Sequence, residues 1–286
     1  MCQRAAVYLP DAIDGARVLV TVKTYPQPSG KYGELVCTAG LLDGEKWIRV
    51  YPVSAELISS DERLPKYSWI RLNLKRKGAD FRPESYSPTD GIDGPIMLDG
   101  HIGTSGLWSE RRRYVEAEVF ESMTDLIALS RKQPPKSLAT LQPREIVDFV
   151  CEPAARDWRS QWLAQSSQGN MFSVKAEGRT KPRHLVRKLP FNYYYEFLTR
   201  GDTRPRRLKI EDWEIGALFL SCLHRADGDE TLANRLVRDK YYSEFCSKKD
   251  LLLFLGTTLK NHWVSRNPFL IIGVFYPPSG RQSVLL

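Results

Sequence analysis

The sequence lacks any long run of apolar residues. No segment of its 286 residues approaches the roughly 18 consecutive apolar residues of a membrane-spanning helix. Its first residues, MCQRAAVYLPDAIDG, have no apolar stretch after a basic start, as a secretory signal would. We therefore expect a soluble cytoplasmic protein that does not bind a membrane.

Cysteine and histidine are few and scattered. The cysteines are Cys2, Cys37, Cys151, Cys222 and Cys246, with no C-x-x-C motif and no Cys/His pair at the spacing of a metal site. The four histidines are equally dispersed. The sequence predicts reduced, mostly buried cysteines and gives no basis for a metal or another cofactor.

Sequence motifs of common enzymes are also missing. The chain contains no G-x-x-x-x-G-K-[ST], G-x-G-x-x-G, G-x-S-x-G or H-E-x-x-H pattern, so common phosphate, dinucleotide, hydrolase and zinc-protease chemistry has no support. One catalytic alternative stays open. Asp80 and Glu84, four residues apart beside Arg82, are candidates for a metal-dependent nuclease, which needs clustered carboxylates.

A second candidate contact follows a predicted strand near the C-terminal end. Gly256, Thr257 and Thr258 begin a polar loop that continues to His262 and Trp263. A polar loop at a strand end can contact a ligand. The alternative is a plain connection between two strands.

The N-terminal third reads as β-structure. Strands are predicted over residues 17–25, 34–42, 46–53 and 67–74, because apolar and β-branched residues alternate with polar ones there. Asp43-Gly44 tolerates the positive φ of a tight turn and predicts a hairpin between the second and third strands. Residues 80–88 form the tail of this β-structure and run into a region rich in Pro, Gly and Asp, up to Gly106, that reads as a long surface loop.

The C-terminal part alternates helical and extended patterns. Helices are predicted in the region 109–132 and over 210–223 and 229–245, and central strands over 250–255 and 268–276. The sequence therefore predicts an α+β protein with an N-terminal OB-like or SH3-like small β-barrel followed by a helical and β C-terminal portion. We expect residues 1–105 to form the barrel domain and residues 106–286 the α+β domain.

The basic charge of the chain is concentrated in one segment, residues 175–209. It holds eleven Lys or Arg and three acids, so its net charge of +8 equals that of the whole chain. Aromatic residues lie between these cations, and basic groups beside aromatic rings suit a ligand with both phosphates and bases. The segment predicts nucleic-acid binding; a solvated connection followed by a core strand is the structural alternative.

The sequence predicts twelve residues as nucleic-acid contacts. They are Lys175, Arg179, Lys181, Arg183, Arg187, Lys188, Tyr193, Tyr195, Arg204, Arg206, Arg207 and Lys209. The cations would contact phosphates from two lips of a groove, and Tyr193 or Tyr195 would stack on bases.

Three stretches carry a resemblance to a family. VLVTVKTYPQPSGKYGELVCTAGLLDGEKWIRVYPV with YSWIRLNL and DFRPES, then IEDWEIGALF, and finally FLGTTLKNHWVSRNPFLIIGVFYPP resemble an uncharacterised family of bacterial hypothetical proteins. The N-terminal part is also similar to the start of dual OB-domain proteins, which implies a suspected nucleic-acid-binding role. Family members often carry Cys and His before the D-W-E segment, whereas this chain has TRGDTRPRRLK, so the resemblance implies no metal ligand.

Together these observations predict a non-catalytic protein that binds DNA or RNA. We hypothesise an accessory role in bacterial defence or mobile-element processes, beside a protein partner such as a helicase or nuclease. Two alternatives stay open: the metal-dependent nuclease, and an interaction module whose basic face docks an acidic protein.

Overall fold

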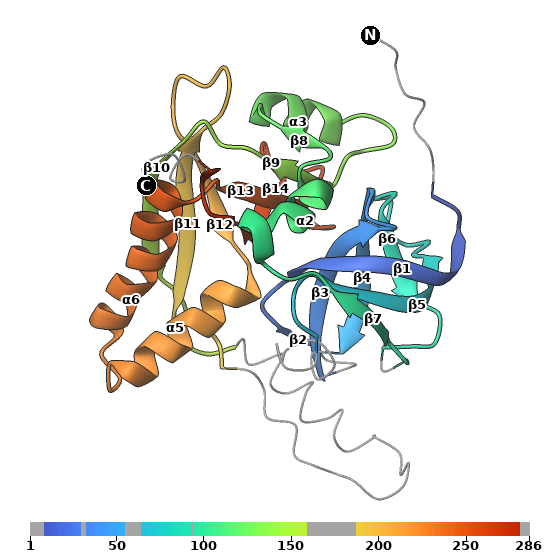
Figure 1. The fold of residues 1–286 in the computed structure, drawn as a ribbon, viewed down its shortest axis with the longest axis horizontal. Helices are drawn as coiled ribbons and strands as arrows, with labels where there is room; N and C mark the ends of the chain where they lie inside the picture. Colours follow the sequence, from blue (N-terminus) through green and yellow to red (C-terminus); the bar gives the residue numbers. More distant parts are fainter. Residues whose placement is uncertain (1–8, 30–32, 55–63, 93, 159–186, 281–286) are drawn as a thin grey trace, which may run out of the picture.

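The computed structural model describes residues 9–29, 33–54, 64–92, 94–158 and 187–280. Two β-sheets lie side by side, with helices on the outer face of the second (Figure 1). The strands are β1 (Ala12–Lys23), β2 (Gln27–Ser29), β3 (Gly33–Leu42), β4 (Lys46–Ser54), β5 (Ser68–Arg76), β6 (Ser85–Pro88), β7 (Met97–His101), β8 (Val119–Phe120), β9 (Leu138–Leu141), β10 (Glu145–Pro153), β11 (Phe191–Leu198), β12 (Arg206–Ile210), β13 (Leu252–Thr257) and β14 (Phe269–Phe275). The helices are α2 (Ser105–Val115), α3 (Met123–Ser130), α5 (Trp213–Arg225), α6 (Glu230–Arg238), the π-helix η1 (Asp239–Glu244) and α7 (Phe245–Lys248).

The first sheet closes into a five-stranded β-barrel. Its strand order is β1-β3-β4-β6-β5, and β5 pairs back onto β1. All of these pairs are antiparallel except β4 with β6, which is parallel. The predicted hairpin between β3 and β4 is confirmed: Leu42 pairs with Lys46, and Asp43 and Gly44 have φ of 51° and 78°. The predicted α+β class with an N-terminal barrel is confirmed.

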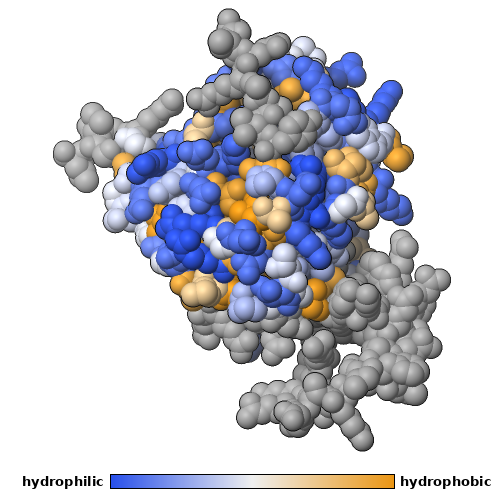
Figure 2. Space-filling view, turned by 90° about the vertical axis from the view of Figure 1, so that its right-hand side faces the viewer, coloured by the Kyte–Doolittle hydropathy of each residue, from blue (hydrophilic) through white to orange (hydrophobic). Residues whose placement is uncertain are grey.

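The long strand β1 is buried on both faces. Val18 and Val20 belong to the barrel interior, whereas Leu19 and Val22 contact the second sheet. This double burial explains why the second half of β1 reads as a nearly continuous apolar run. Elsewhere the outer side of the barrel is mostly hydrophilic around a small apolar area (Figure 2).

The second sheet has the order β10-β11-β12-β14-β13-β9-β8. The strands predicted over 250–255 and 268–276 are confirmed as β13 and β14, which lie within this sheet. Helices α5 and α6 cover the face of β10, β11 and β12 (Figure 1). Each begins with an aspartate whose carboxylate accepts backbone N–H bonds: Asp212 for α5 and Asp229 for α6.

The barrel and the second sheet share one apolar core. Leu19, Ala39 and Leu41 of the barrel pack with Leu252 and Ile272 of the second sheet. Two aromatic contacts cross the boundary: Trp47 meets Phe254 with ring centroids 5.3 Å apart, and Tyr67 meets Phe275 at 6.0 Å. The outer face of β3 and β4 is therefore covered by β9, β13 and β14.

Two predictions from the sequence were wrong. The region predicted as a surface loop contains the strand β7, and the stretch before it contains β6; both strands are too short to give a clear alternation of apolar residues. The helical region 109–132 contains two helices, α2 and α3, separated by β8, because the chain pairs β8 with β9 between them. The Ser122 hydroxyl caps α3 by accepting the N–H of Asp125 at 3.2 Å. Among the described residues, no helix is long and apolar enough to cross a membrane.

A buried ion pair joins the two parts at the start of α5. Lys66, which precedes β5, donates to the Asp212 carboxylate at 2.9 and 3.1 Å and lies 3.1 Å from Glu214. The side chains of Lys66 and Asp212 are 7% and 0% exposed. Burial raises the pKa of Asp212 to about 6, although Lys66 opposes this shift. Despite burial, the charges of Asp212 and Glu214 raise the pKa of Lys66.

We expect Lys66→Met to lower the free energy of unfolding by about 3–5 kcal/mol at pH 8, because it leaves the Asp212 carboxylate buried without its cation. The folded-state pKa of Asp212 lies above its ordinary value of 3.8, so folding takes up a proton between about pH 4 and pH 6. Lowering the pH towards 5 therefore protonates the carboxyl in the folded protein before it does so in the unfolded chain. The loss caused by the substitution should therefore be smaller at pH 5 than at pH 8, as measured by urea unfolding.

The matched control is Arg200→Met. Arg200 pairs with Glu121 at 2.9 Å, but the two side chains are 69% and 54% exposed. Removing a cation from such a surface pair should cost less than about 1 kcal/mol at either pH. Equal losses for the two variants would show that the buried pair does not join the barrel to α5.

Candidate nucleic-acid interface

The predicted basic segment is only partly described. Lys175, Arg179, Lys181 and Arg183 lie outside the described residues. The other predicted contacts are Arg187, Lys188, Tyr193, Tyr195, Arg204, Arg206, Arg207 and Lys209, on or beside the β11–β12 hairpin.

Of the two predicted lips, Arg187 and Lys188 on one and Arg204 on the other lie at opposite ends of this hairpin, whereas Lys209 of the second lip lies near the first. Arg187 and Lys188 precede the Phe191 end of β11, whereas Arg204 precedes β12, beside the other end. The eight residues of β11 span about 26 Å. Lys188 and Lys209, one from each predicted lip, line a common pocket with a volume of about 260 Å³.

Most of these cations already have partners. Three form ion pairs: Arg206 with Asp202, Arg207 with Glu152 and Lys209 with Glu211, each at 2.6 Å. Lys188 donates to the backbone carbonyls of Ala155 and Asp157. The net charge of the segment in the sequence therefore overstates the positive charge that its described residues offer to a ligand.

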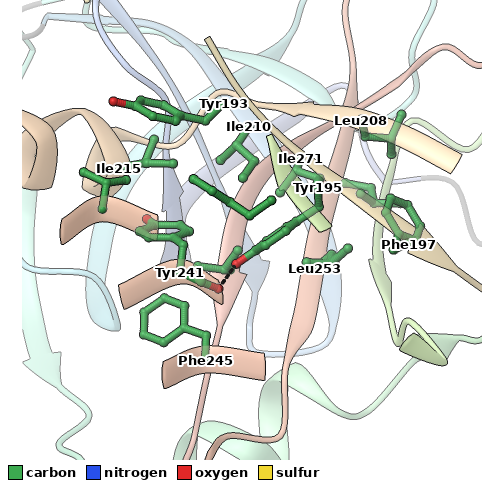
Figure 3. Close-up of a cluster of buried hydrophobic side chains, with 14 of the residues drawn as sticks. Tyr193, Tyr195, Phe197, Leu208, Ile210, Ile215, Tyr241, Phe245, Leu253 and Ile271 are labelled. Carbon is green, nitrogen blue, oxygen red and sulfur yellow. Dashed lines mark hydrogen bonds between the residues drawn. The ribbon is translucent and has the colours of Figure 1, made fainter. Parts of the chain in front are cut away.

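The predicted stacking role of Tyr193 and Tyr195 is wrong for this structure. Both rings are buried in the core beneath α5, α6 and η1, with 1% and 0% exposure (Figure 3). Their hydroxyls donate to the Asn234 side chain at 2.7 Å and to the Tyr241 carbonyl at 2.6 Å. Because side chains alternate along β11, Tyr193 and Tyr195 point into the core and Tyr194 lies on the other face. This agrees with the structural alternative, in which the segment contains a core strand.

A different surface brings exposed aromatic rings together. The loop between β5 and β6 carries Phe81, and the loop between β13 and β14 carries Trp263; their rings are 40% and 45% exposed. The two ring centroids lie 5.1 Å apart. Below them the buried His262 ring contacts both, at 4.9 Å from Phe81 and 4.6 Å from Trp263. We call Phe81 and Trp263 the aromatic platform. One of its rings comes from the barrel and the other from the second sheet.

The β13–β14 loop is held by polar contacts from below. His262 is fully buried, and its Nε2 lies 2.8 Å from the Ser130 carbonyl while its Nδ1 lies 2.8 Å from the Thr257 hydroxyl. Because the carbonyl can only accept, Nε2 carries the proton and Nδ1 accepts from the hydroxyl. Arg131, after α3, donates to the carbonyls of His262 and Ser265. A neutral imidazole satisfies both contacts, and burial favours this form because it lowers the pKa of His262.

A second layer of buried polar groups joins the barrel to this loop. Arg49 of β4 donates to the Ser85 and Ser137 hydroxyls at 3.0 and 3.1 Å. Arg49 and Arg82 both donate to the Thr257 carbonyl. We call Arg49, Asp80, Arg82, Glu84, Ser137, Thr257 and His262 the junction cluster. Its bonds fix the β5–β6 loop against the β13–β14 loop.

The carboxylates of the nuclease alternative belong to this cluster. Asp80 accepts bonds from the Arg82 side chain at 2.8 and 2.6 Å, and these hold its pKa below the ordinary value although burial opposes the shift. Glu84 accepts from the Ser137 N–H and hydroxyl, both at 2.9 Å. Each of the four carboxylate oxygens of Asp80 and Glu84 therefore already accepts a hydrogen bond. Within the described ranges, no group of three or more His, Cys, Asp or Glu side chains is placed to hold a metal.

The loop that carries Trp263 is basic. Residues 257–268 contain Lys260 and Arg266 and no Asp or Glu. Both cations are exposed, as is Lys132 at the end of α3. We call Phe81, Leu259, Lys260, Trp263, Val264 and Arg266 the junction surface. It combines exposed rings with cations that form no ion pair among the described residues.

The sequence pointed to only part of this surface. The loop from Gly256 to Trp263 stands out because a polar stretch with a Trp follows a buried strand. Phe81 and the cations Lys260 and Arg266 were missed, since nothing local shows that residues 80–85 and 257–266 meet. More than 170 residues separate the two segments, so their contact cannot be inferred from either one alone.

We expect His262 to make the unfolding free energy depend on pH. Burial lowers its pKa, with Arg131 and Arg82 adding to the shift while the bond to Ser130 and the charge of Glu84 oppose it. Below pH 6.5 the unfolded chain binds a proton at this histidine more strongly than the folded protein does. The free energy of unfolding therefore falls, by up to about 1.4 kcal/mol for each pH unit of acidification. His262→Gln should flatten the urea-unfolding profile between pH 7 and pH 5.

His224→Gln provides the comparison, because His224 is exposed on α5. This variant should keep the wild-type profile. If His262→Gln loses as much stability between pH 7 and pH 5 as the wild type does, the buried neutral imidazole is not what makes the junction sensitive to acid.

Comparison with family models places two matches along the chain. Residues 14–117 match a Domain of unknown function (DUF8758), and residues 119–286 match a Domain of unknown function (DUF8757). The chain has no detectable match among curated proteins. The second match spans more than half of the 286 residues. The chain therefore belongs to the DUF8757 family, and its N-terminal barrel corresponds to the DUF8758 domain.

Proposed function

We propose that this protein binds nucleic acid through the junction surface, without chemistry of its own, and that its barrel is of the OB type. The observation that carries the proposal is the pairing of two exposed rings, Phe81 and Trp263, one of them on a loop, residues 257–268, that has two exposed cations and no acid. Rings stack on bases while cations contact phosphates.

The strand order supports the OB assignment. The barrel has five strands, with the hairpin strands β3 and β4 second and third, and β5 and β6 fourth and fifth. OB barrels bind oligonucleotides with the face of the second and third strands and with the loops after the first and fourth strands. The β5–β6 loop, which carries Phe81, is the loop after the fourth strand.

The C-terminal part changes which of these surfaces a ligand can reach. Trp47 and Arg49 on β4 are buried against the second sheet, so the face of β3 and β4 is not open. The β5–β6 loop remains at the surface, beside the β13–β14 loop. A nucleic acid would therefore contact the rim of the barrel and the second sheet together.

Two other functions are less well supported. The nuclease alternative requires carboxylate oxygens for a metal, whereas those of Asp80 and Glu84 already accept hydrogen bonds. The interaction module would use the same cations on an acidic protein. The exposed rings favour nucleic acid, because a carboxylate-rich surface gives them nothing to stack on.

A binding experiment tests the proposal. We expect labelled DNA and RNA oligonucleotides to bind the full chain at 50 mM salt, with an affinity that falls steeply towards 200 mM. Lys260→Glu combined with Arg266→Glu should weaken binding by roughly 10- to 100-fold and reduce the slope of log affinity against log salt by roughly 1.4–1.8, because two phosphate contacts are lost. Fluorescence anisotropy measures both quantities.

The control reverses the same amount of charge elsewhere. Arg225 and Arg235 are exposed on α5 and α6, which cover the far face of the second sheet. Arg225→Glu combined with Arg235→Glu should leave the salt slope near the wild-type value. Equal losses in the two double variants would show that net charge, not the junction surface, determines binding. Binding of an acidic polypeptide but of no oligonucleotide would favour the interaction module.

A further inference from the structure

We infer that the nucleic acid bound at the junction surface is single-stranded, with one unstacked base lying on the Trp263 ring. This inference rests on the proposed function and specifies its ligand. Trp263 is 45% exposed, although large aromatic side chains are usually well buried. Phe81 packs against it at a tilt of 36°, and His262 meets it edge-on at 73°.

The indole is held in place before any ligand arrives. The loop closes on itself through the Ser265 N–H and the Asn261 carbonyl, 3.0 Å apart. The Thr258 hydroxyl accepts the Asn261 N–H at 3.2 Å. Arg131 binds the carbonyls on both sides of Trp263 and Val264, those of His262 and Ser265. A ring on a fixed backbone loses little conformational entropy when a base stacks on it.

The surroundings of the ring favour a base over a protein side chain. Lys260 lies three residues before Trp263 and Arg266 three residues after it, so the cations bracket the ring along the loop. A strand whose base covers the indole carries phosphates on both sides of that base. Val264, 84% exposed, and Leu259, 42% exposed, provide apolar contact for a sugar or a neighbouring base.

The same geometry disfavours a duplex. Base faces inside a double helix are already stacked on their neighbours, so a ring fixed at the protein surface cannot reach them without unstacking a base pair. Single strands present open base faces at no such cost. Trp263 should therefore contribute to binding of single strands and contribute little to binding of duplexes.

The test compares Trp263→Ala with Trp263→Phe in the full chain, using a labelled single-stranded 12-mer and a duplex of the same length. We expect Trp263→Ala to weaken single-strand binding about 5- to 100-fold, the effect of losing one stacked base, and to leave the salt slope unchanged. Trp263→Phe should retain most of the affinity. Duplex binding should be weaker and insensitive to either substitution.

Leu232→Ala, on α6, removes an apolar side chain of similar exposure, 39%, and should bind like the wild type. Thermal unfolding should show all three variants folded, because Trp263 is at the surface. If Trp263→Ala binds single strands like the wild type while Lys260→Glu with Arg266→Glu does not, the stacking inference fails and the proposed function stands. Equal losses on single strand and duplex also overturn it. If the wild type binds neither oligonucleotide at 50 mM salt, both proposals fail and the platform is better explained as a protein-docking surface.

Discussion

The packing of the barrel against the second sheet is the constraint on which the other features depend. It covers the outer face of β3 and β4, buries Arg49, and places the β5–β6 loop beside the β13–β14 loop. Apolar contacts such as that of Trp47 with Phe254 supply the buried surface between the two parts. The polar groups of the junction cluster fix the position of one part relative to the other. A buried guanidinium is tolerated only when its donors are satisfied, which limits the two parts to this relative position.

The same constraint determines what is left for binding. A barrel standing alone would offer the face of β3 and β4, but here that face is part of the core. The surface that remains contains residues of both parts, because Phe81 comes from the barrel and Trp263 from the second sheet. Neither part alone would present the pair of rings. A ligand on the junction surface would therefore favour the docked arrangement over any separated one.

The sequence allowed much of the fold to be predicted but little of the candidate site. Alternation of apolar residues and the Asp43-Gly44 turn indicated the barrel strands, and apolar runs indicated β13 and β14. Short strands such as β6 and β12 were missed because their residues are polar and their pairing is decided by distant neighbours. The site depends on such a distant meeting, between residues 80–85 and 257–266. Local patterns carry no information about it.

The contrast between the two basic regions shows why charge counted along a chain is a weak guide to a binding surface. Residues 175–209 have a formal charge of +8, yet three of their described cations are paired with acids at 2.6 Å, and Arg187 and Arg204 lie at opposite ends of the hairpin. Residues 257–268 have only two Lys or Arg, but both are exposed and no carboxylate accompanies them in the loop. A phosphate responds to the local field that remains after pairing and screening, which extends about 10 Å at 0.1 M salt. On the proposed function, two unpaired cations beside a fixed ring would therefore attract a strand more specifically than a larger number of cations already neutralised by their neighbours.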